Sequence, residues 1–344
     1  MKTFRKREEI KVGVVGYGGA YNMGKHHLLQ MEEAGMKPTA VAEIDPERLE
    51  IAREDFPGIQ IYSSLTEMLE MSEDVNLVTI ITPHNTHAPL AVEALNGGCH
   101  VVSEKPMTIT TEECDSMINV AEKNDLLVTA YHNRHWDGCI MNALEKISAG
   151  GIGDVIRVEA HMGSWGTPTQ TWRASKSKSG GILYDWGVHL LEYTFQLIDS
   201  DIIEVSGYAK SGFWSDETPW KDDTNEDEAL AVVRYKNGSW SSLCISHIDS
   251  KPKEGQLEIT GTKGTFVFSN REWTMITHEG DTTVTTRGPS PESKGKLFYE
   301  NVAAYLTGKE DLVITPEYAR RPIHVLDLAD KSAREGKAVE AVYQ

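Results

Sequence analysis

The sequence predicts two domains: an α/β domain built on a parallel sheet, followed by an α+β domain with an open, mostly antiparallel sheet. Over the first 130 or so residues, short apolar runs alternate with helical patterns. From about residue 155 the strands become longer and two-faced, and turn signals separate them. Strand and helix taken in turn imply right-handed crossovers and a parallel sheet, whereas two-faced strands joined by tight turns are typical of antiparallel pairing. We expect the domains to occupy residues 1–136 and 137–344.

In the first domain, the strands are expected at KVGVVGYG, TAVAEI, LVTII and HVVSE. The helices between and after them are expected at GKHHLLQMEEAG, PERLEIARE, SLTEMLEM, HAPLAVEALNGG and TTEECDSMINVAEKND. Apolar residues recur at helical spacing in these segments and β-branched residues fill the runs between them.

In the second domain, the strands are expected at IRVEAHMG, EALAVVRYKNGSWSSLCISH and EITGTKGTFVFS, with turns at KNG and TKG. One face of such a sheet should be covered. The stretch WSDETPWKDDTNEDE (214–228) is expected to be a solvated loop, although its tryptophans could reach the edge of a pocket.

Composition excludes some partners. The net charge is −18, from 34 basic and 52 acidic residues, which disfavours binding to nucleic acid or to an anionic membrane surface. No apolar run reaches the roughly 18 residues of a membrane span, and MKTFRKREEIK has no signal-peptide core, so a cytoplasmic protein is expected. The four cysteines form no CxxC pair, which predicts neither a disulfide framework nor a metal site.

A glycine-rich loop follows the first expected strand. In GYGGAYNMGKHH, Gly16 and Gly18 would let backbone N–H groups meet a pyrophosphate at the start of a helix, as in a Rossmann domain. Tyr21 stands where a strict GxGxxG pattern has its third glycine; Gly24 could replace that glycine if residues 21–23 are an insertion.

Glu43 ends the second expected strand. A carboxylate there can accept both hydroxyls of the adenosine ribose and repel a 2′-phosphate, which predicts NAD in preference to NADP. The alternative is a surface acid that simply precedes the Asp45-Pro46 helix start.

Two further segments leave strand ends where open parallel sheets bind ligands. In TPHNTHAPLA, Thr82, Pro83, Asn85 and His87 could line the nicotinamide side of the crevice. In EKPM, a backbone fixed by proline could aim Lys105 at a substrate oxygen; alternatively, the proline ends the strand and the lysine points to water.

The segment SGGILYDWGVHLLEY places Asp185 and His189 one helical turn apart on one face, where the carboxylate could orient the imidazole as a general base. A core histidine beside a solvated acid is the alternative.

Together these segments resemble the Gfo/Idh/MocA oxidoreductases, named for glucose-fructose oxidoreductase and inositol dehydrogenase. The resemblance extends over nearly the whole chain: it includes VGVVGYGG, AVAEIDPER, TPHNTHAPLAVEAL, EKPM, YHNRHWD, GGIGDVIRVEAH, TWRASKSKSGGILYDWGVHLLE, LEITGTKGTFVF, ITPEYA and SAREGKAV. EKP followed by GG and D-x-x-x-H is its most specific part. The resemblance implies that Lys105, Asp185 and His189 surround the reacting carbon.

The remaining site residues are implied by the same resemblance. The expected cofactor contacts are Gly16, Gly18, Gly19, Ala20, Glu43, Thr82, Pro83, Asn85, His87, Glu104 and Lys105. The expected substrate contacts are Lys105, Arg134, Trp165, Trp172, Arg173, Asp185 and His189, although both tryptophans would also fit a core. No metal is expected. Two features depart from the family pattern: residues 21–23 lengthen the loop, and Pro322 should delay or kink the C-terminal helix.

The predicted activity is transfer of hydride between a secondary alcohol of a sugar, inositol or related polyol and NAD, with His189 or Lys105 as the base. Two alternatives remain from the sequence: a glycoside hydrolase or lyase that oxidises its sugar transiently, and a non-catalytic sugar sensor. A homodimer or homotetramer, paired through the exposed sheet face, is implied by the resemblance.

Overall fold

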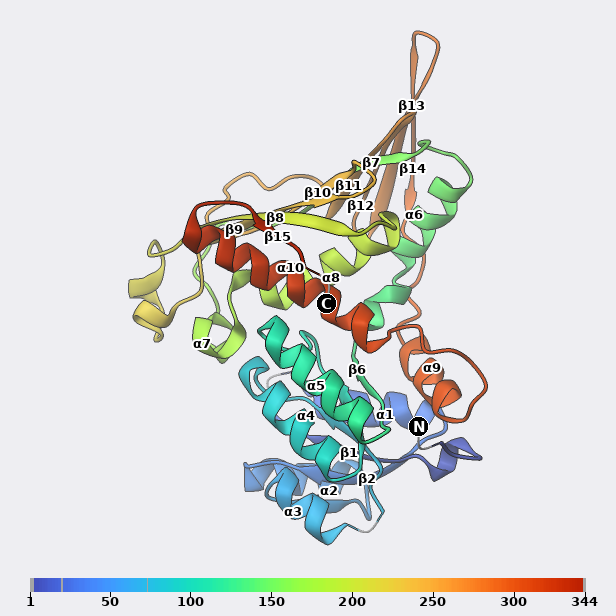
Figure 1. Cartoon of the computed structure of the whole chain (residues 1–344), viewed down its shortest axis with the longest axis vertical. Coiled ribbons are helices and arrows are strands. Elements are labelled where there is room, and N and C mark those ends of the chain that lie inside the picture. Colours follow the sequence, from blue (N-terminus) through green and yellow to red (C-terminus); the bar gives the residue numbers. More distant parts are fainter. Residues whose placement is uncertain (1–2, 20, 73, 343–344) are drawn as a thin grey trace. The chain divides into compact units, whose positions relative to one another are not determined.

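The structure is a computed structural model that describes residues 3–19, 21–72 and 74–342 (Figure 1). The chain divides into two compact units. The first unit takes the chain up to His132 together with Lys296–Arg320, and the second takes Asn133–Gly295 and the chain from Arg321 onward. The expected division into two continuous stretches at residue 136 therefore differs from the compact units by one returning segment.

The first unit contains a six-stranded sheet in the order β3-β2-β1-β4-β5-β6, and every neighbouring pair is parallel. This confirms the Rossmann prediction. Helices cover both faces of such a sheet, so most residues of its central strands are buried, as at the fully buried Val12, Val14 and Val101. The strands are β1 (Lys11–Val15), β2 (Lys37–Ala42), β3 (Gln60–Tyr62), β4 (Leu77–Ile80), β5 (His100–Ser103) and β6 (Val128–Ala130).

The helices of the first unit begin at recognisable caps. The Asp45 and Ser64 side chains accept N–H groups at the starts of α2 and α3, and Thr110 and Glu113 form a capping box at α5. The helices are α1 (Met23–Glu33), α2 (Pro46–Asp55), α3 (Leu65–Met71), α4 (His87–Asn96), α5 (Thr111–Lys123) and α9 (Leu297–Leu306).

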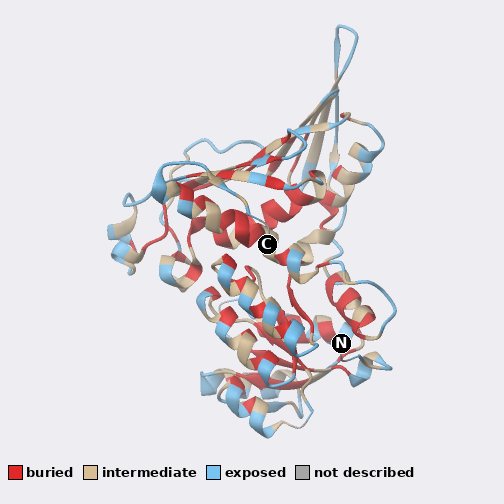
Figure 2. Ribbon diagram, in the orientation of Figure 1, coloured by how far each residue is buried: buried red, intermediate tan, exposed pale blue. Residues whose placement is uncertain are grey.

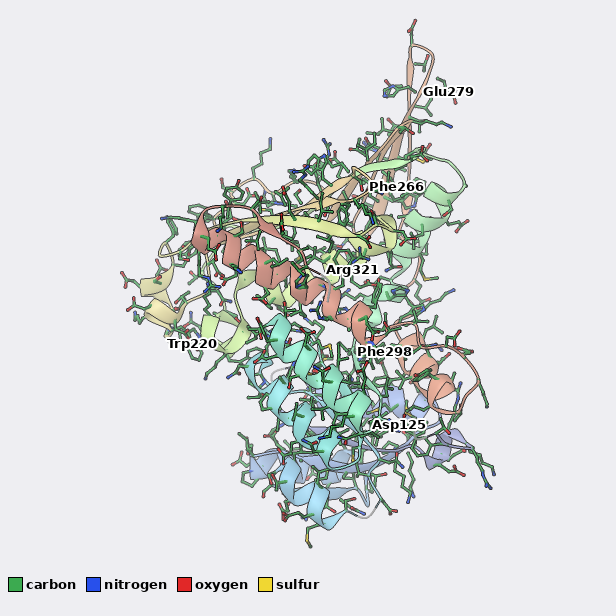
Figure 3. All side chains as sticks on the ribbon, viewed as in Figure 1. Asp125, Trp220, Phe266, Glu279, Phe298 and Arg321 are labelled. Carbon is green, nitrogen blue, oxygen red and sulfur yellow. The ribbon has the colours of Figure 1, made fainter. Side chains whose placement is uncertain are left out.

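Helix α9 joins the first unit although the chain passes through most of the second unit before reaching it. Phe298 lies on this helix (Figure 3). The Phe298 and Tyr299 rings are buried, with centroids 5.0 and 5.4 Å from that of Tyr131, which follows β6. Aromatic pairs at this spacing bury large apolar areas, which explains why the chain returns.

The second unit contains a nine-stranded sheet in the order β14-β13-β12-β11-β7-β10-β9-β8-β15. Strand β10 pairs with β7 in parallel and the other neighbours are antiparallel, which confirms a mostly antiparallel sheet. The strands are β7 (Val155–Gly163), β8 (Ile202–Lys210), β9 (Glu228–Tyr235), β10 (Trp240–Ser246), β11 (Leu257–Gly261), β12 (Gly264–Phe268), β13 (Glu272–Glu279), β14 (Thr282–Pro289) and β15 (Val339–Glu340).

Helices α8 (Ile182–Leu197) and α10 (Pro316–Glu335) carry long stretches of buried residues (Figure 2), and α6 (Gly138–Ser148) and α7 (Lys176–Ser179) complete the unit. Glycines let the helices approach the sheet. A Cβ on Gly187 of α8 would lie 2.9 Å from Leu243 of β10, and one on Gly207 of β8 would lie 1.9 Å from the Ala329 carbonyl of α10.

The expectation that Pro322 would make the C-terminal helix begin later is wrong. Helix α10 begins at Pro316 and continues through Pro322 to Glu335. The proline forfeits one backbone hydrogen bond, but the buried Ile323 and Leu326 that follow it hold the helix in the core.

The outward face of the second sheet is partly exposed. Tyr208 of β8 is 63% exposed, whereas the preceding Gly207, on the opposite face of the strand, is buried. This alternation is that of a sheet with one covered face. Within the described residues, no helix is both long and apolar enough to cross a membrane.

Candidate active site

The glycine-rich loop after β1 has the shape that a dinucleotide requires. Gly16 has φ +100°, and a Cβ there would lie 2.3 Å from the Ile81 carbonyl oxygen, so only glycine fits this turn. At Gly18, by contrast, a Cβ would meet nothing within 4 Å, so the loop is open at that position. Ala20 lies outside the described residues.

Gly24 takes the place of the third glycine. Helix α1 begins at Met23, and a Cβ on Gly24 would lie 2.6 Å from the Tyr17 ring and 2.8 Å from the Gly16 carbonyl. The helix therefore packs directly on the turn, which is the role of the last glycine in the fingerprint. Of residues 21–23, Tyr21 and Asn22 precede the helix and Met23 is its first residue.

Glu43 follows β2 and turns back to the loop. One carboxylate oxygen accepts the Tyr17 N–H at 2.6 Å and the other accepts the Asp45 N–H at 3.1 Å. Arg48 also reaches the loop, where its Nε donates to the Tyr17 carbonyl at 2.8 Å. Glu43 therefore bonds both to the glycine loop and to the residue that caps α2. The turn, the open position and the packed helix fit a pyrophosphate and its ribose.

The segment after β4 contains four of the expected cofactor contacts, and they differ in how far they are buried. Thr82 and Pro83 are half-buried and Asn85 is exposed. His87 is fully buried, with Nδ1 2.8 Å from the Pro106 carbonyl and Nε2 2.9 Å from the Thr82 carbonyl. Both ring nitrogens thus face backbone, so His87 supports this region from inside the unit.

The EKP residues form a turn directly after β5, and the Lys105-Pro106 bond is cis. Glu104 accepts from His27 Nε2 at 3.0 Å through one oxygen and from the Lys105 N–H at 2.7 Å through the other. Burial alone would raise the pKa of the Glu104 carboxyl, but the His27 contact and the charge of Lys105 outweigh it and lower this pKa to about 2. The carboxylate is therefore ionised at neutral pH.

In the second unit, Asp185 and His189 lie one turn apart on α8. The two glycines before the helix have φ of +92° and +133°, and the buried Glu226 accepts the Ile182 N–H at 2.9 Å. A negative charge at the first turn of a helix is favourable. The glycine turn and Glu226 together fix where α8 starts.

Lys176 neutralises that acid. Its Nζ lies 2.6 Å from Glu226 and 3.1 Å from Asp330. Burial would lower the pKa of Lys176, but these two carboxylates raise it. Next to Glu226, the Asp227 carboxylate accepts the N–H groups of Phe213 and Trp214. Glu226 and Asp227 are both buried. The expectation of a solvated loop is therefore wrong at this end of the 214–228 stretch.

Arginines from two segments approach the two predicted catalytic residues of α8. Arg173 donates to Asp185 at 2.5 Å. Arg134 lies over the Trp186 ring at 4.6 Å, and Trp186 meets His189 edge to face at 5.7 Å between centroids. His189 is 4% exposed. Trp186 was not predicted as a site residue, although its position between Asp185 and His189 on the helix is a signal for it.

The tryptophans differ in their surroundings. Trp165 is 57% exposed and contacts the Phe213 and Trp214 rings, which rules out the core alternative for Trp165. Trp172 is half-buried and packs under the Arg173 guanidinium at 5.2 Å.

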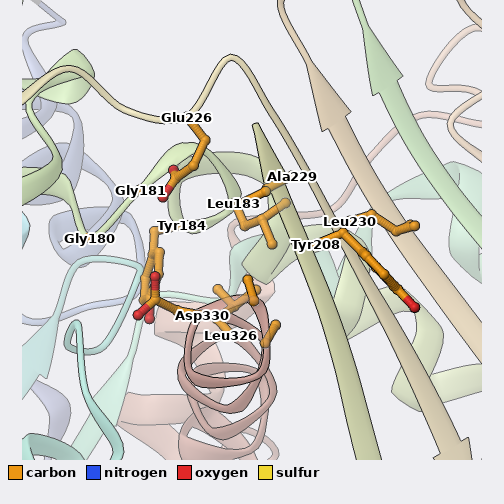
Figure 4. Close-up of a pocket in the computed structure, with 13 residues that line it drawn as sticks. Gly180, Gly181, Leu183, Tyr184, Tyr208, Glu226, Ala229, Leu230, Leu326 and Asp330 are labelled. Carbon is orange, nitrogen blue, oxygen red and sulfur yellow. The ribbon is translucent and has the colours of Figure 1, made fainter. Parts of the chain in front are cut away.

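A pocket lies beside the glycine turn (Figure 4). It has an empty volume of about 320 Å³ between the start of α8, strands β8 and β9, and α10. Among the described residues, its lining includes Tyr184, Glu226 and Asp330 but neither Asp185 nor His189. The pocket is therefore formed behind the predicted catalytic face of α8.

Family comparisons agree with this arrangement. Residues 10–132 match the model of an oxidoreductase family with an NAD-binding Rossmann fold, and residues 144–341 match that family's C-terminal alpha/beta domain. The chain is a member of the Gfo/Idh/MocA oxidoreductase family, as EKPM and the later D-x-x-x-H predicted. Its first domain is an NAD-binding Rossmann domain, so its cofactor is a nicotinamide dinucleotide.

Several relatives are dehydrogenases. A scyllo-inositol 2-dehydrogenase (NADP(+)) of Bacillus subtilis is 30% identical over 57% of this chain and 54% of its own length, so the match spans about half of that protein. A myo-inositol 2-dehydrogenase of Thermotoga maritima is 25% identical over 78% of each chain.

Solved structures match nearly the full chain. An NAD-binding protein from Listeria innocua has a TM-score of 0.83 and 26% identity, covering 98% of each chain. Levoglucosan dehydrogenase in complex with NADH and levoglucosan has the same TM-score at 19% identity, covering 97% of this chain and 100% of that one; this likeness concerns the fold.

Proposed function

We propose that the chain is a dehydrogenase that oxidises a secondary alcohol of an inositol, sugar or related polyol. The observation that carries this proposal is the Asp185 and His189 pair on α8, with Arg173 bonded to the acid, in a chain of this oxidoreductase family. The inositol dehydrogenases among its relatives support the substrate class.

The proposed chemistry begins with the proton. A secondary alcohol is a very weak acid, so its oxidation needs a base to take the hydroxyl proton as the carbon is oxidised. His189 takes this proton, and Asp185 orients the ring and stabilises its charged form. Lys105 holds the substrate oxygen and its developing charge, and it is the other candidate for the base. When bound, the nicotinamide ring supplies the hydride acceptor.

Four side chains would shape the substrate site. The Arg173 guanidinium can donate to substrate hydroxyls, and its bond to Asp185 orients both groups. The Trp172 and Trp165 rings suit the C–H face of a sugar or cyclitol. Arg134 reaches the ring of Trp186, beside His189.

For the cofactor, we propose a preference for NAD over NADP. Glu43 presents its carboxylate at the glycine loop, where it would repel a 2′-phosphate. Arg48, which reaches the same loop from α2, would attract that phosphate, so the ratio of kcat/KM for the two cofactors measures which charge prevails. A ratio that favours NADP would contradict the preference.

A matched pair of glycines tests the cofactor site. Gly18→Ala meets no neighbour and should leave the unfolding midpoint unchanged but weaken NADH binding. Gly24→Ala forces a contact with Tyr17 and Gly16 and should cost about 1–3 kcal/mol of stability. NADH fluorescence titration and urea unfolding measure the two effects, and unchanged NADH binding by Gly18→Ala would contradict a pyrophosphate at this loop.

For assembly, we propose a homodimer or homotetramer paired through the exposed sheet face that includes Tyr208. Sedimentation of the protein and of a Tyr208→Lys variant tests this. A monomer, or an assembly that the variant leaves unchanged, would contradict it.

The decisive experiment is a panel of substrates with NAD and with NADP, followed by absorbance of the reduced cofactor. The panel includes myo-inositol, scyllo-inositol, levoglucosan, common pyranoses and their glycosides. We expect reduction of the cofactor by at least one cyclitol or sugar. Many turnovers of a glycoside without added NAD and without free NADH would instead indicate glycoside cleavage, and binding of sugars without any turnover would indicate a sensor.

A further inference from the structure

A buried chain of hydrogen bonds lies behind the turn that carries Lys105. His27, in the middle of α1, is 0% exposed. Its Nε2 lies 3.0 Å from Glu104 Oε1, and its Nδ1 lies 2.6 Å from the Tyr299 hydroxyl oxygen. A carboxylate only accepts hydrogen bonds, so Nε2 donates to it, and Nδ1 shares a second hydrogen bond with the Tyr299 hydroxyl. Three segments far apart in the sequence thus meet at this histidine.

The Glu104 carboxylate links His27 to the backbone at Lys105. Its second oxygen accepts the N–H of Lys105 at 2.7 Å, so the imidazole and the lysine backbone are bridged by one side chain. Charge-assisted hydrogen bonds of this kind are among the stronger ones in a buried site.

A second buried histidine holds the other side of the lysine. His87 Nδ1 lies 2.8 Å from the carbonyl of Pro106, and its Nε2 lies 2.9 Å from the carbonyl of Thr82 at the end of β4. The backbone is therefore fixed immediately before and immediately after Lys105. A flexible lysine side chain gains precision only when its Cα is held in this way.

We propose that His27 and His87 are positioning residues for Lys105, and that His27 acts through the Glu104 carboxylate. This inference rests on the proposed role of Lys105 at the substrate oxygen. Neither histidine touches substrate; they keep the ammonium group at a fixed distance from the reacting atoms. Misplacement by about 1 Å can lower turnover by about 10²-fold.

The experiment compares variants of buried histidines in the full-length protein. His27→Leu removes the donor to Glu104, whereas His27→Gln keeps an N–H group that can replace it. The control is His100→Leu at the opposite end of β5, where a fully buried ring accepts the Leu127 N–H at 3.0 Å. We measure kcat and KM with the substrate from the panel, NADH affinity by fluorescence, and the urea midpoint.

We expect His27→Leu and His87→Leu to lower kcat by roughly 10–100-fold with KM and NADH affinity changed by less than about threefold. His27→Gln should recover most of the loss, and His100→Leu should leave kcat unchanged at a similar loss of stability. Parallel loss of kcat and stability in all three leucine variants, or no recovery with glutamine, would overturn the proposal.

A second readout does not depend on turnover. The rate at which acetic anhydride modifies Lys105, measured by mass spectrometry against exposed lysines such as Lys123, reports how the ammonium is held. It should change several-fold in His27→Leu but not in His100→Leu, and an unchanged rate would overturn the positioning role. If Lys105→Met keeps full activity, the proposed function fails, whereas the acetylation rates still decide whether the histidines position this lysine.

Discussion

The turn after β5 and the first turns of α8 carry the predicted catalytic groups of the two units, and they are held in different ways. The turn is fixed by buried partners from distant segments: His27 lies 77 positions from Glu104 and 272 from Tyr299. Asp185 is held by Arg173, only 12 positions away, and the two side chains are 30% and 23% exposed. A buried polar network fixes one geometry, whereas a half-exposed ion pair can exchange its partner for a substrate group.

The largest expected effect comes from removing the predicted base on α8. His189→Ala should lower kcat by about 10²–10⁴-fold, because the base is lost, while NAD affinity stays nearly intact. Steady-state kinetics and NADH titration measure this. The matched control is His161→Ala, a histidine of β7 paired with Asp249. Equal losses of turnover and cofactor affinity in His189→Ala would mean that the residue is structural.

The next effect concerns Glu104, in the buried network at the turn after β5, and the way in which the free energy of unfolding depends on pH. The pKa of Glu104 falls from 4.5 to about 2 on folding, so its stabilisation is complete above pH of about 4.5 and is lost as the pH falls toward 2. The full effect is about 3 kcal/mol, of which about 2 kcal/mol disappears between pH 6 and pH 3.

Urea unfolding of the protein and of Glu104→Gln at pH 6 and pH 3 measures this contribution. The variant should lose about 2 kcal/mol less on acidification. Equal acid sensitivity of the two proteins would show that Glu104 titrates normally.

A smaller effect is expected at the start of α8. Glu226→Gln keeps an acceptor for the Ile182 N–H but loses the attraction of Lys176, so the free energy of unfolding should fall by about 1 kcal/mol. Lys253→Met, which removes an exposed pair with Glu159, serves as the control and should change stability by less. Similar losses from both variants would contradict a particular role for Glu226.

The smallest effect on stability is expected at Arg173. Because its ion pair with Asp185 is partly exposed, Arg173→Met should cost less than about 1 kcal/mol on unfolding. KM for the alcohol should rise several-fold if the guanidinium meets substrate hydroxyls. A large fall in stability with unchanged KM would mean that the arginine holds the helix and leaves the substrate alone.

The sequence predicted the repeating parts of the fold well, because hydrophobic period and turn residues are local signals. Strand and helix alternation in the first unit and the KNG turn between β9 and β10 are examples. In the first unit it missed the short strands β3 and β6, which are three residues each and carry little pattern. In the second unit it also missed the longer strands β8, β13 and β14. It also missed the parallel pairing of β10 with β7, which depends on contacts that no local pattern encodes.

The candidate site divides in the same way. Spacing in the sequence was enough to predict two residue pairs, Asp185 with His189 and Gly16 with Gly18. His27 lies on the buried face of an ordinary amphipathic helix, at three positions after Gly24 and one before Leu28, so its sequence context is that of a core residue. Its partners Glu104 and Tyr299 become visible only when the fold brings them together.

The return of Lys296–Arg320 to the first unit has a practical consequence for engineering. Gene truncation after His132 would remove Tyr299 and Phe298, and would leave a cavity beside Tyr131 and a buried His27 without its hydroxyl partner. To produce the nucleotide-binding unit alone, the segment that ends at His132 must therefore be joined by a linker to Lys296–Arg320. The same joined unit is the one to graft onto another protein.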